Sequence, residues 1–430
     1  MKRHTFSRRQ FLAASGAAAV PFIVPSSVFG KNAPSNRITI GCIGMGNQGI
    51  FANMNSFLNQ DDAHVVAICD VQQAAIKKAL DLFKKRGGSA DCKCVRDFRE
   101  VIADKSIDAV CISTPDHWHV PMSLMVLEAG KDVFCEKPTL MIAEGDALVE
   151  AVNKHKAVFQ IGLEDRSTAH FHKLIEWVRN GAIGELKSIS VVLPRGIEYP
   201  KEQPIKVPEG LDYNMWLGPA PFSPYTENRI HPGYWRNIRD YSGGMITDWG
   251  SHLMDTAQLA VNAPGVCPVE ISGTGFIPKD SMTDVPVDFD IAYRYDNGIE
   301  VNVKSSKKFD YGRDAEIHLE GTEGKVSKVG WDGNLLTDPP EILRTRYKPE
   351  DSKYIKLPPC EQRNFLDCVK SRKATTYTAE TMRDLCNTLH MGVIAIELGR
   401  KLKWDNKTHS FINDDQANKR RSRPARNWLC

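Results

Sequence analysis

A glycine-rich turn between a short apolar strand and a helix constrains this chain more than any other feature. The strand is predicted over residues 38–43, and the turn after it has the spacing G-x-G-x-x-G. Its glycines are Gly44, Gly46 and Gly49. A second apolar strand at residues 64–69 follows the helix and ends in an acid, Asp70. This order of elements predicts a dinucleotide-binding βαβ unit, whereas the glycines alone would also suit a turn that binds nothing.

Each glycine has a separate physical role in such a unit. We expect Gly44 to make the tight turn, Gly46 to let the backbone approach a pyrophosphate, and Gly49 to let the helix pack closely on the strand. The backbone amides at the start of the helix, where Asn47 and Gln48 lie, then face the negative phosphates.

The acid at the end of the second strand indicates which nucleotide is bound. Asp70 would accept hydrogen bonds from ribose hydroxyls and repel a 2′-phosphate. No Lys or Arg follows it before Lys77. NAD is therefore favoured over NADP as the cofactor.

Three more short apolar runs, at residues 109–113, 133–135 and 158–161, predict further strands with helices between them. Alternating strands and helices of this kind form a parallel sheet that is covered on both faces. The chain has 430 residues, more than one hydrophobic core usually organises, so a second domain is expected.

The second half of the chain has a different pattern. Residues 186–326 alternate strand-like runs with turns, and Asn297-Gly298 is a strong hairpin signal. Residues 361–371 and 379–402 have the pattern of helices.

The first thirty residues have the layout of an export signal. Residues 7–12 read SRRQFL and precede an alanine-rich apolar stretch, residues 13–24, that is too short to span a bilayer as a stable helix. Paired arginines followed by Phe-Leu resemble the twin-arginine signal, with cleavage near Gly30, and a disordered N-terminus with accidental arginines is the alternative. We expect a protein that is handed to the twin-arginine export machinery, is periplasmic or otherwise exported, and has no stable membrane insertion.

Charge and cysteine usage argue against other classes. The formal net charge is +3, but the leader and the tail from Lys419 carry bases without acids, so the chain between them is mildly acidic and unsuited to nucleic acid. For the tail we expect an arm that packs on acidic neighbours, with RNA or anionic lipid as the alternative. Four cysteines lie in predicted buried strands, where cysteine behaves as a small hydrophobe: Cys42, Cys69, Cys111 and Cys135. Cys92 and Cys94 lack a second pair at metal-ligand spacing, so no metal is expected.

Two further motifs lie at the ends of predicted strands. Residues 114–119 read TPDHWH, and residues 134–138 read FCEKP. Later segments read WLGPAP at 216–221, YWR at 234–236 and GGMITDWGSH at 243–252. Together with the glycine turn, these motifs resemble the glucose-fructose oxidoreductase, inositol dehydrogenase and rhizopine-catabolism family (Gfo/Idh/MocA) over essentially the whole chain after the leader.

The resemblance implies a fold and an assembly. It implies an α/β protein with an N-terminal Rossmann domain, whose parallel sheet is doubly wound, and a C-terminal α/β domain with a large, open, mostly antiparallel sheet. That sheet commonly supplies the oligomer interface in the family, so a homodimer or homotetramer is expected. We place the boundaries at 1–30 for the signal peptide, 31–162 for the NAD-binding domain, 163–404 for the substrate-binding and oligomerisation domain, and 405–430 for the basic C-terminal arm.

The two motifs place further residues at the cofactor. In open α/β sheets, ligands bind outside the carboxyl ends of the parallel strands, where both motifs fall. The residues expected to contact the cofactor there are Thr114, Pro115, His119, Glu136 and Lys137. Lys137 precedes a proline, which restricts its backbone to extended geometry and allows a cis bond. Held between two domains, Lys137 is expected to be partly desolvated, which would lower its pKa and suit it to proton transfer. A surface cation is the alternative.

Asp248 and His252 are four residues apart at the start of an apolar helical stretch, so they share one helix face. On their own, an N-cap and a core histidine would explain them. The family resemblance implies an acid and a histidine at this spacing in the active site. Asp255, one turn further, is expected to orient a neighbour or to form a salt bridge.

Taken together, these features predict an NAD(P)-dependent oxidoreductase that transfers hydride between nicotinamide and a secondary alcohol of a sugar, polyol or glycoside. His252 is the first choice for the general base, since its unperturbed pKa lies near neutrality. Lys137 would polarise the same oxygen, and Asp248 would orient the substrate or tune the other two. The residues predicted to bind the substrate are Arg166, Tyr234, Trp235, Arg236, Asp248 and His252.

Export suggests a cofactor that leaves the cytoplasm tightly bound in the folded protein, because free NAD is scarce outside it. An alternative activity is a redox-neutral glycosidase or epimerase that oxidises a ring hydroxyl and later returns the hydride. A non-catalytic sugar-binding relative is a third possibility, which the joint presence of Lys137, Asp248 and His252 argues against.

Overall fold

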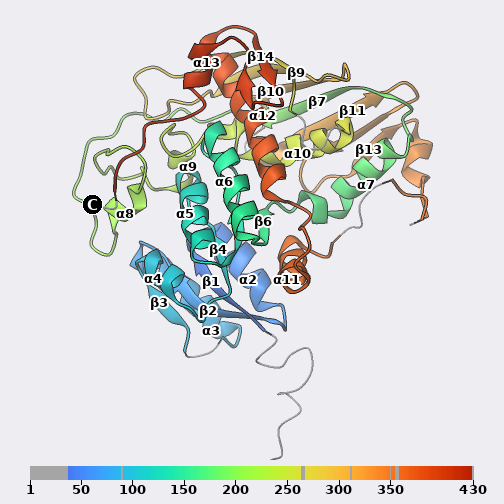
Figure 1. Cartoon of the computed structure of the whole chain (residues 1–430). Helices are drawn as coiled ribbons and strands as arrows, with labels where there is room; N and C mark the ends of the chain where they lie inside the picture. The colour runs from blue at the N-terminus through green and yellow to red at the C-terminus, as the bar shows by residue number, and fades with distance from the viewer. Residues whose placement is uncertain are drawn as a thin grey trace, which may run out of the picture.

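Two sheets organise the chain, one at the bottom of Figure 1 and the other at its upper right. The computed structural model describes residues 37–88, 91–262, 267–309, 312–348, 350–353 and 358–428. The predicted leader, residues 1–30, lies outside the described residues. The strands between residues 38 and 162 form the first sheet, and the strands from residue 186 onward form the second.

The first sheet is wholly parallel and has the strand order β3-β2-β1-β4-β5-β6. Its strands are β1 (Ile38–Ile43), β2 (Ala63–Cys69), β3 (Lys93–Val95), β4 (Ala109–Ile112), β5 (Asp132–Glu136) and β6 (Phe159–Gly162). Five of the six were predicted to within one residue at each end, and the short, half-exposed β3 was not predicted. The chain order reverses between β1 and β4, so a crevice forms outside the carboxyl ends of these two strands.

Helices cover both faces of this sheet. They are the continuous η3 (Gln48–Met54) and α2 (Asn55–Leu58), followed by α3 (Gln73–Lys85), α4 (Phe98–Ala103), α5 (Asp116–Glu128) and α6 (Ile142–His155). A further helix, α11 (Glu361–Ser371), comes from the far end of the chain. Its Phe365 packs against Phe57 and Phe134, with ring centroids 6.3 and 5.8 Å apart. The core of the first sheet is therefore completed by residues more than 200 positions away.

The second sheet has nine strands in the order β13-β12-β11-β7-β10-β9-β8-β14-β15. They are β7 (Leu186–Pro194), β8 (Glu270–Phe276), β9 (Asp288–Arg294), β10 (Glu300–Ser306), β11 (Glu316–Gly321), β12 (Lys325–Val329), β13 (Leu335–Asp338), β14 (Leu402–Asp405) and β15 (Ser410–Phe411). Among the described strands of this sheet, β7 and β10 alone pair in parallel, and the turn at Asn297-Gly298 joins β9 to β10 as an antiparallel hairpin. The two sheets confirm the predicted fold class.

One face of the second sheet is covered by helices and the other is open. The covering helices are α7 (Ala169–Arg179), α10 (Trp249–Val261) and α12 (Ala379–Leu398). Along β7, Ile189 and Val191 are buried in this core, whereas Ser188 and Ser190 alternate with them and are half-buried on the open face. The helix predicted at 379–402 is too long: Gly399 takes a left-handed φ of 61° and ends α12, and Leu402 already begins β14.

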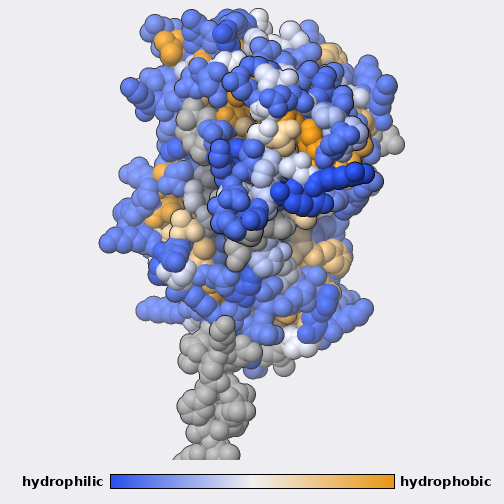
Figure 2. Space-filling model, turned by 90° about the vertical axis from the view of Figure 1, so that its right-hand side faces the viewer, coloured by the Kyte–Doolittle hydropathy of each residue, from blue (hydrophilic) through white to orange (hydrophobic). Residues whose placement is uncertain are grey.

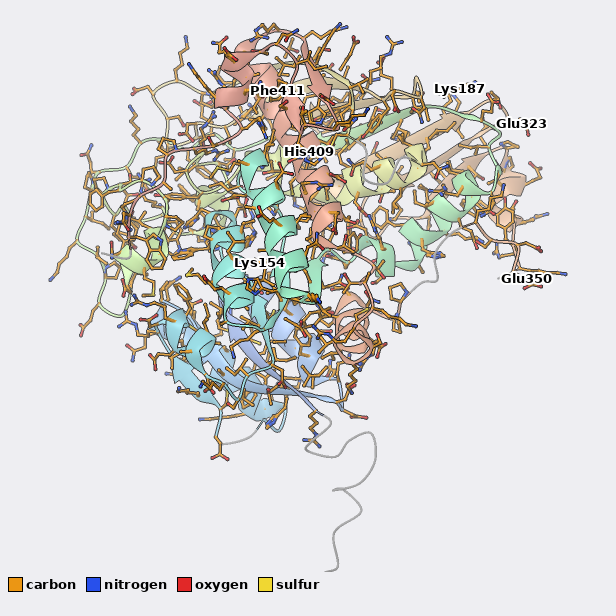
Figure 3. All side chains as sticks on the ribbon, viewed as in Figure 1. Lys154, Lys187, Glu323, Glu350, His409 and Phe411 are labelled. Atoms are coloured by element: carbon orange, nitrogen blue, oxygen red, sulfur yellow. The ribbon has the colours of Figure 1, made fainter. Side chains whose placement is uncertain are left out.

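Short elements complete the fold. These are η4 (Asp165–Ser167), α8 (Tyr213–Leu217), α9 (Pro232–Trp235), η5 (Gly244–Ile246), η6 (Gly312–Asp314), η7 (Pro340–Arg344) and α13 (Asp415–Lys419). His409 and Phe411, labelled in Figure 3, lie in the upper C-terminal segment near α6, where His409 Nδ1 is 2.6 Å from a carboxylate oxygen of Asp146.

The C-terminal segment then folds back over the molecule and ends beside α8 (Figure 1). Its arginines pack partly on acids, with Arg420 3.3 Å from Glu397 and Arg421 3.9 Å from Asp146. Arg426 donates to the carbonyl of Gly218 at 2.9 Å. This geometry is that of an arm packed on acidic and backbone acceptors.

The surface shown in Figure 2 is mainly hydrophilic, with hydrophobic side chains in scattered groups. None of the helices among the described residues has the length and apolar character needed to cross a membrane.

Candidate active site

A cavity of about 460 Å³ lies outside the carboxyl ends of β1, β4 and β5, at the predicted crevice. Its lining combines the glycine turn, the two motifs after β4 and β5, the end of α9 and the beginning of α10. Segments from both sheets therefore share one cavity. This arrangement suits a site in which a cofactor and a substrate meet.

The glycine turn leaves room where a pyrophosphate would lie. Gly44 has a φ of +88°, and a Cβ there would lie 2.6 Å from the Ser113 backbone. A Cβ on Gly49 would lie 1.9 Å from the Gly44 carbonyl oxygen, so Gly49 permits the close packing of η3 on the strand end. A Cβ on Gly46, by contrast, would meet nothing within 4 Å, and Gly46 lines the cavity with Asn47 and Gln48. The turn therefore fits a dinucleotide backbone.

Asp70 is held in place at the same end of the cavity. One carboxylate oxygen accepts from the Met45 amide at 2.6 Å and the other from the Gln72 amide at 2.7 Å. Burial raises the pKa of Asp70 to about 6, while these two amides act in the opposite direction. Arg96, which follows β3, also lines this end of the cavity. The sequence around Asp70 does not reveal this cation, because β3 brings it in from 26 positions away.

The two motifs after β4 and β5 are joined by His119. Its ring nitrogens lie 2.8 Å from the carbonyl oxygens of Thr114 and Pro138. Burial lowers the pKa of His119 to about 4, so the neutral ring donates to one of these carbonyls only. Pro115 lines the cavity beside them, and the buried hydroxyl of Thr114 has no hydrogen-bond partner among the described residues. A polar group of a bound ligand would supply the hydrogen-bond partner that this hydroxyl lacks.

Glu136 lines the cavity and takes part in a series of side-chain hydrogen bonds. Its Oε1 accepts from Asn53 at 2.8 Å and from Gln48 at 3.0 Å. Asn53 in turn accepts from Gln362 of α11 at 3.0 Å. Burial raises the pKa of Glu136 to about 7. A helix from the C-terminal part of the chain thus supports the cofactor end of the cavity.

Lys137 and Asp248 form the centre of the site. Lys137, whose bond to Pro138 is cis, donates from Nζ to Asp248 Oδ1 at 2.7 Å and to the Asp248 carbonyl at 3.0 Å. Arg236 Nε lies 3.2 Å from the other carboxylate oxygen, and its guanidinium stacks 4.4 Å from the centroid of Trp235. The Asp248 side chain makes no N-cap hydrogen bond to α10, so capping does not explain it.

The expected direction of the Lys137 pKa is corrected by this contact. Burial alone would lower it, but Asp248 raises the pKa of Lys137 above its ordinary value. Burial alone would raise the pKa of Asp248, but Lys137 and Arg236 hold it below the usual range. Lys137 is therefore a cationic hydrogen-bond donor in this arrangement.

His252 faces the same cavity and is held by an acid that the sequence analysis missed. Its Nδ1 lies 2.9 Å from Oδ2 of Asp165, a buried residue of η4. Burial, together with the charge of Lys137, lowers the pKa of His252 to about 4, and burial raises that of Asp165 well above its usual range. Among the described residues no hydrogen bond engages Nε2. His252 therefore presents one nitrogen to the cavity while Asp165 orients the other.

Two residues predicted to bind the substrate lie outside the cavity lining. Arg166 forms two hydrogen bonds to Asp255, at 2.6 and 3.0 Å, and stacks on Tyr377. Tyr234 stacks on Tyr199, with ring centroids 3.7 Å apart. Trp235 and Arg236, by contrast, line the cavity. The expected salt bridge of Asp255 is present.

Further residues that were not predicted as site residues line the cavity, one of them, Asp116, within the TPDHWH motif. Asp116 is buried and accepts from Ser242 at 2.6 Å, and burial raises its pKa to about 7. Trp331 and Arg313 reach the cavity from loops of the second sheet. Neither lies in a recognisable motif, since their placement depends on how β11 and β12 pair. Among the described residues no group of three or more His, Cys, Asp or Glu side chains has metal-binding geometry.

Fold and cavity together define a nucleotide-dependent oxidoreductase with two α/β domains. The model of an oxidoreductase family with an NAD-binding Rossmann fold matches residues 38–163, and that of the same family's C-terminal alpha/beta domain matches residues 197–429. The chain belongs to the Gfo/Idh/MocA oxidoreductase family.

Similar proteins include a dehydrogenase. The chain is 28% identical to myo-inositol 2-dehydrogenase of Thermotoga maritima over 291 residues, 67% of this chain and 74% of that protein. It is 30% identical to a glycosyl hydrolase family 109 protein of Shewanella baltica over 163 residues, but this match covers 33% of the chain and 35% of the relative. Among solved structures, the aldose-aldose oxidoreductase of Caulobacter crescentus has a TM-score of 0.62 at 18% identity, with 85% of this chain and 99% of that one covered. That likeness concerns the fold.

Proposed function

We propose that this protein oxidises a secondary alcohol of a sugar, polyol or glycoside, with NAD as the hydride acceptor. One observation carries the proposal: Lys137, Asp248 and His252 line the same cavity as the glycine turn and Asp70. The named activity of the inositol dehydrogenase relative supports a polyhydroxylated substrate. Trp235, Trp249 and Arg236 offer the stacking faces and hydrogen-bond donors that such a substrate requires.

Each polar group would have a separate task. NAD, held by the glycine turn and Asp70, would supply the hydride acceptor. The hydroxyl proton passes to Nε2 of His252, and the Asp165 carboxylate stabilises the resulting imidazolium. Lys137 donates a hydrogen bond to the same substrate oxygen and stabilises its developing negative charge. Asp248 keeps Lys137 protonated and, with Arg236, fixes its position.

Substitution of the two proposed catalytic groups tests this assignment. Lys137→Ala and His252→Ala should each lower kcat about 100-fold or more, because each removes a group that acts on the reacting oxygen. The measurement is steady-state NADH formation with a panel of polyols, aldoses and glycosides. Lys154→Ala, on the exposed end of α6 (Figure 3), is the matched control and should leave kcat unchanged. Wild-type turnover in both cavity variants would exclude the assignment.

The preference for NAD over NADP rests on Asp70, whose two oxygens are held by backbone amides and face the cavity. Heat denaturation of the purified protein, followed by mass spectrometry of the supernatant, identifies any resident nucleotide. Stoichiometric NAD or NADH would support a tightly held NAD cofactor. NADP in its place would contradict the preference and would direct attention to Arg96.

A redox-neutral glycosidase is the second candidate, favoured by the similarity to family 109 glycosyl hydrolases. In this case the hydride taken from a ring carbon returns to it after the glycosidic bond is cleaved. Aryl glycosides distinguish the two activities, since release of the phenol without net NADH formation supports the glycosidase. Net NADH formation supports the dehydrogenase.

Export and assembly complete the proposal. The SRRQFL segment supports export by the twin-arginine route to the periplasm, which carries folded proteins. The open face of the second sheet supports a homodimer or homotetramer, because Ser190, His318 and Asn302 form a row of half-buried polar side chains across β7, β11 and β10. Cell fractionation of the full-length chain and of a variant with Arg8 and Arg9 replaced by Lys tests the first point, and light scattering tests the second.

A further inference from the structure

Two tryptophans form an aromatic corner beside the proposed base. Trp249 and Trp331 line the cavity with their ring planes 78° apart and their centroids 5.7 Å apart. Each ring centroid lies 5.1 Å from that of His252. The two indoles therefore contact the proposed base, His252, but have no role in the proposed proton transfer.

The Trp331 ring is only partly covered by the protein. It packs on Phe171 at 5.1 Å and remains partly accessible, and none of the hydrogen bonds among the described residues uses its indole N–H. A large apolar ring with an unused donor in a polar cavity is suited to a ligand that offers a C–H face and a hydroxyl.

The loop that presents Trp331 is held by a buried lysine. Lys328 is 1% exposed and donates from Nζ to the carbonyls of Gly330, Trp331 and Gly333 at 2.5, 2.8 and 2.6 Å. It makes no ion pair among the described residues. A buried ammonium group without a carboxylate is costly, so its three carbonyl contacts indicate a loop whose shape is specified. The Trp331 amide adds a hydrogen bond to the Arg313 carbonyl.

Beside the same corner, one residue of the cavity lining is exposed to solvent. Arg313 lines the cavity there and pairs with Asp332 at 2.6 Å, and the two side chains are 65% and 74% exposed. A substituent on a ring that reacts at His252 and Lys137 would therefore extend over Trp331 toward this exposed ion pair.

We infer that Trp331 and Trp249 form an outer subsite that binds the aglycone or second ring of a glycoside, so the preferred substrate is a glycoside rather than a free monosaccharide or polyol. This inference rests on the proposed function, whose site supplies the reacting end. Trp331 is then a specificity-determining residue, and Lys328 is a positioning residue that acts through it.

The test compares matched substrates in variants of the full-length protein with its resident nucleotide. The probes are D-glucose, D-galactose and myo-inositol against the corresponding p-nitrophenyl α- and β-glycosides, cellobiose and lactose. NADH formation and nitrophenol release are both recorded, so either activity is detected. Trp331→Ala should raise KM for the glycosides and disaccharides about tenfold, the equivalent of 1.4 kcal/mol, and change KM for the free monosaccharides and polyol less than about threefold.

Three further variants keep the result interpretable. Trp331→Phe retains a ring against Phe171 and should recover most of the lost affinity. Lys328→Met should reproduce the glycoside defect, because the loop loses three hydrogen bonds. Phe222→Ala removes an aromatic ring that is 71% exposed and outside this cavity, and should change neither KM.

The outcomes separate this inference from the proposed function. A wild-type protein that turns over the free sugars better than their glycosides overturns the inference alone. So does an equal rise of KM for both classes in Trp331→Ala, because the tryptophan would then hold the reacting ring. A wild-type protein that acts on no member of the panel overturns the proposed function, and the inference with it.

Discussion

Burial lowers the pKa of both Lys137 and His252, and the charged partners of each residue decide the outcome. Lys137 is removed from water, yet the contact with Asp248 raises its pKa. His252 is removed from water beside that same cation, and its pKa falls to about 4. One group is therefore a charged donor and the other a neutral ring, which is the division of labour that alcohol oxidation requires.

Asp165 should control the basicity of His252. Burial raises the pKa of Asp165, but an imidazolium on His252 favours the ionised form of this acid. That carboxylate, 2.9 Å from Nδ1, raises the pKa of His252 relative to a variant without it. Asp165→Asn should lower kcat for alcohol oxidation about 100-fold and move the acidic limb of the kcat/KM profile to lower pH. The measurement is a pH–rate profile of the variant and the wild type.

Asp255→Asn provides the comparison for this prediction. Asp255 is as buried as Asp165 but pairs with Arg166 instead of His252. Its charge also raises the pKa of His252 but makes no hydrogen bond to the ring, so its substitution should destabilise the fold and move the acidic limb less than Asp165→Asn does. An unshifted profile in Asp165→Asn would show that the acid only fills space beside the ring.

The element that links the two halves of the molecule most directly is α11. Phe365 on its inner face is fully buried between Phe57 of α2 and Phe134 of β5. On the same helix, Gln362 donates to Asn53, which donates to Glu136 at the bottom of the cavity. Helix α11 thus belongs to the chain segment after residue 163 but packs in the core of the first sheet.

Truncation of the α11 anchor should destabilise the nucleotide-binding domain. Phe365→Ala removes a fully buried ring and should lower the free energy of unfolding by about 3–5 kcal/mol. Urea unfolding followed by fluorescence and circular dichroism measures this loss. Phe276→Ala at the 49% exposed end of β8 is the control and should cost less than about 1 kcal/mol. Equal losses in the two variants would contradict the proposed role of α11.

At the scale of the whole molecule, the C-terminal arm joins distant parts of the surface. Trp428 packs against Trp118 and Phe98, with ring centroids 4.7 and 5.9 Å apart. Both partners line the cavity. Arg426 ties the same segment to the carbonyl of Gly218 after α8. The arm therefore packs against residues that line the cavity.

Removal of residues 424–430 should weaken the packing of the residues that line this part of the cavity. We expect faster loss of bound nucleotide and a free energy of unfolding lower by about 1–3 kcal/mol, since a half-buried Trp side chain is lost. Thermal unfolding and the rate of nucleotide release after dilution measure both effects. Trp428→Ala should reproduce most of them, and Lys419→Ala on the exposed face of α13 should reproduce none. Unchanged nucleotide release in the truncated protein would limit the arm to a stabilising role.

The first sheet was predictable from local patterns because its strands are short, apolar runs separated by helices, and a parallel sheet buries both faces of every central strand. Strand β3 and the end of helix α12 were not predicted correctly. Strand β3 has three residues, two of them exposed, and so lacks an apolar run. The helix predicted at 379–402 extends beyond the end of α12, because Leu398 and Leu402 continue its apolar spacing. Gly399 nevertheless ends the helix.

Motif residues in the site were predictable because backbone geometry or cofactor chemistry demands their types at fixed positions. The glycines of the turn, Asp70, Glu136 and Lys137 all line or shape the cavity as expected. The pairing of Arg166 with Asp255 could not be predicted in this way, because the two residues lie 89 positions apart.

The class of protein follows from local sequence patterns, because the spacing of the glycine turn, the acid at the end of the next strand and the motifs after β4 and β5 are local requirements of a dinucleotide site. The groups that share a proton or a substrate with those motifs are brought to them by tertiary contacts alone. Asp165 meets His252 across 87 positions, Asp248 meets Lys137 across 111, and Trp331 reaches the cavity because β11 and β12 pair in one register. Such contacts depend on long-range packing, which no local pattern encodes, and they set both the charges of the site and the shape that selects its substrate.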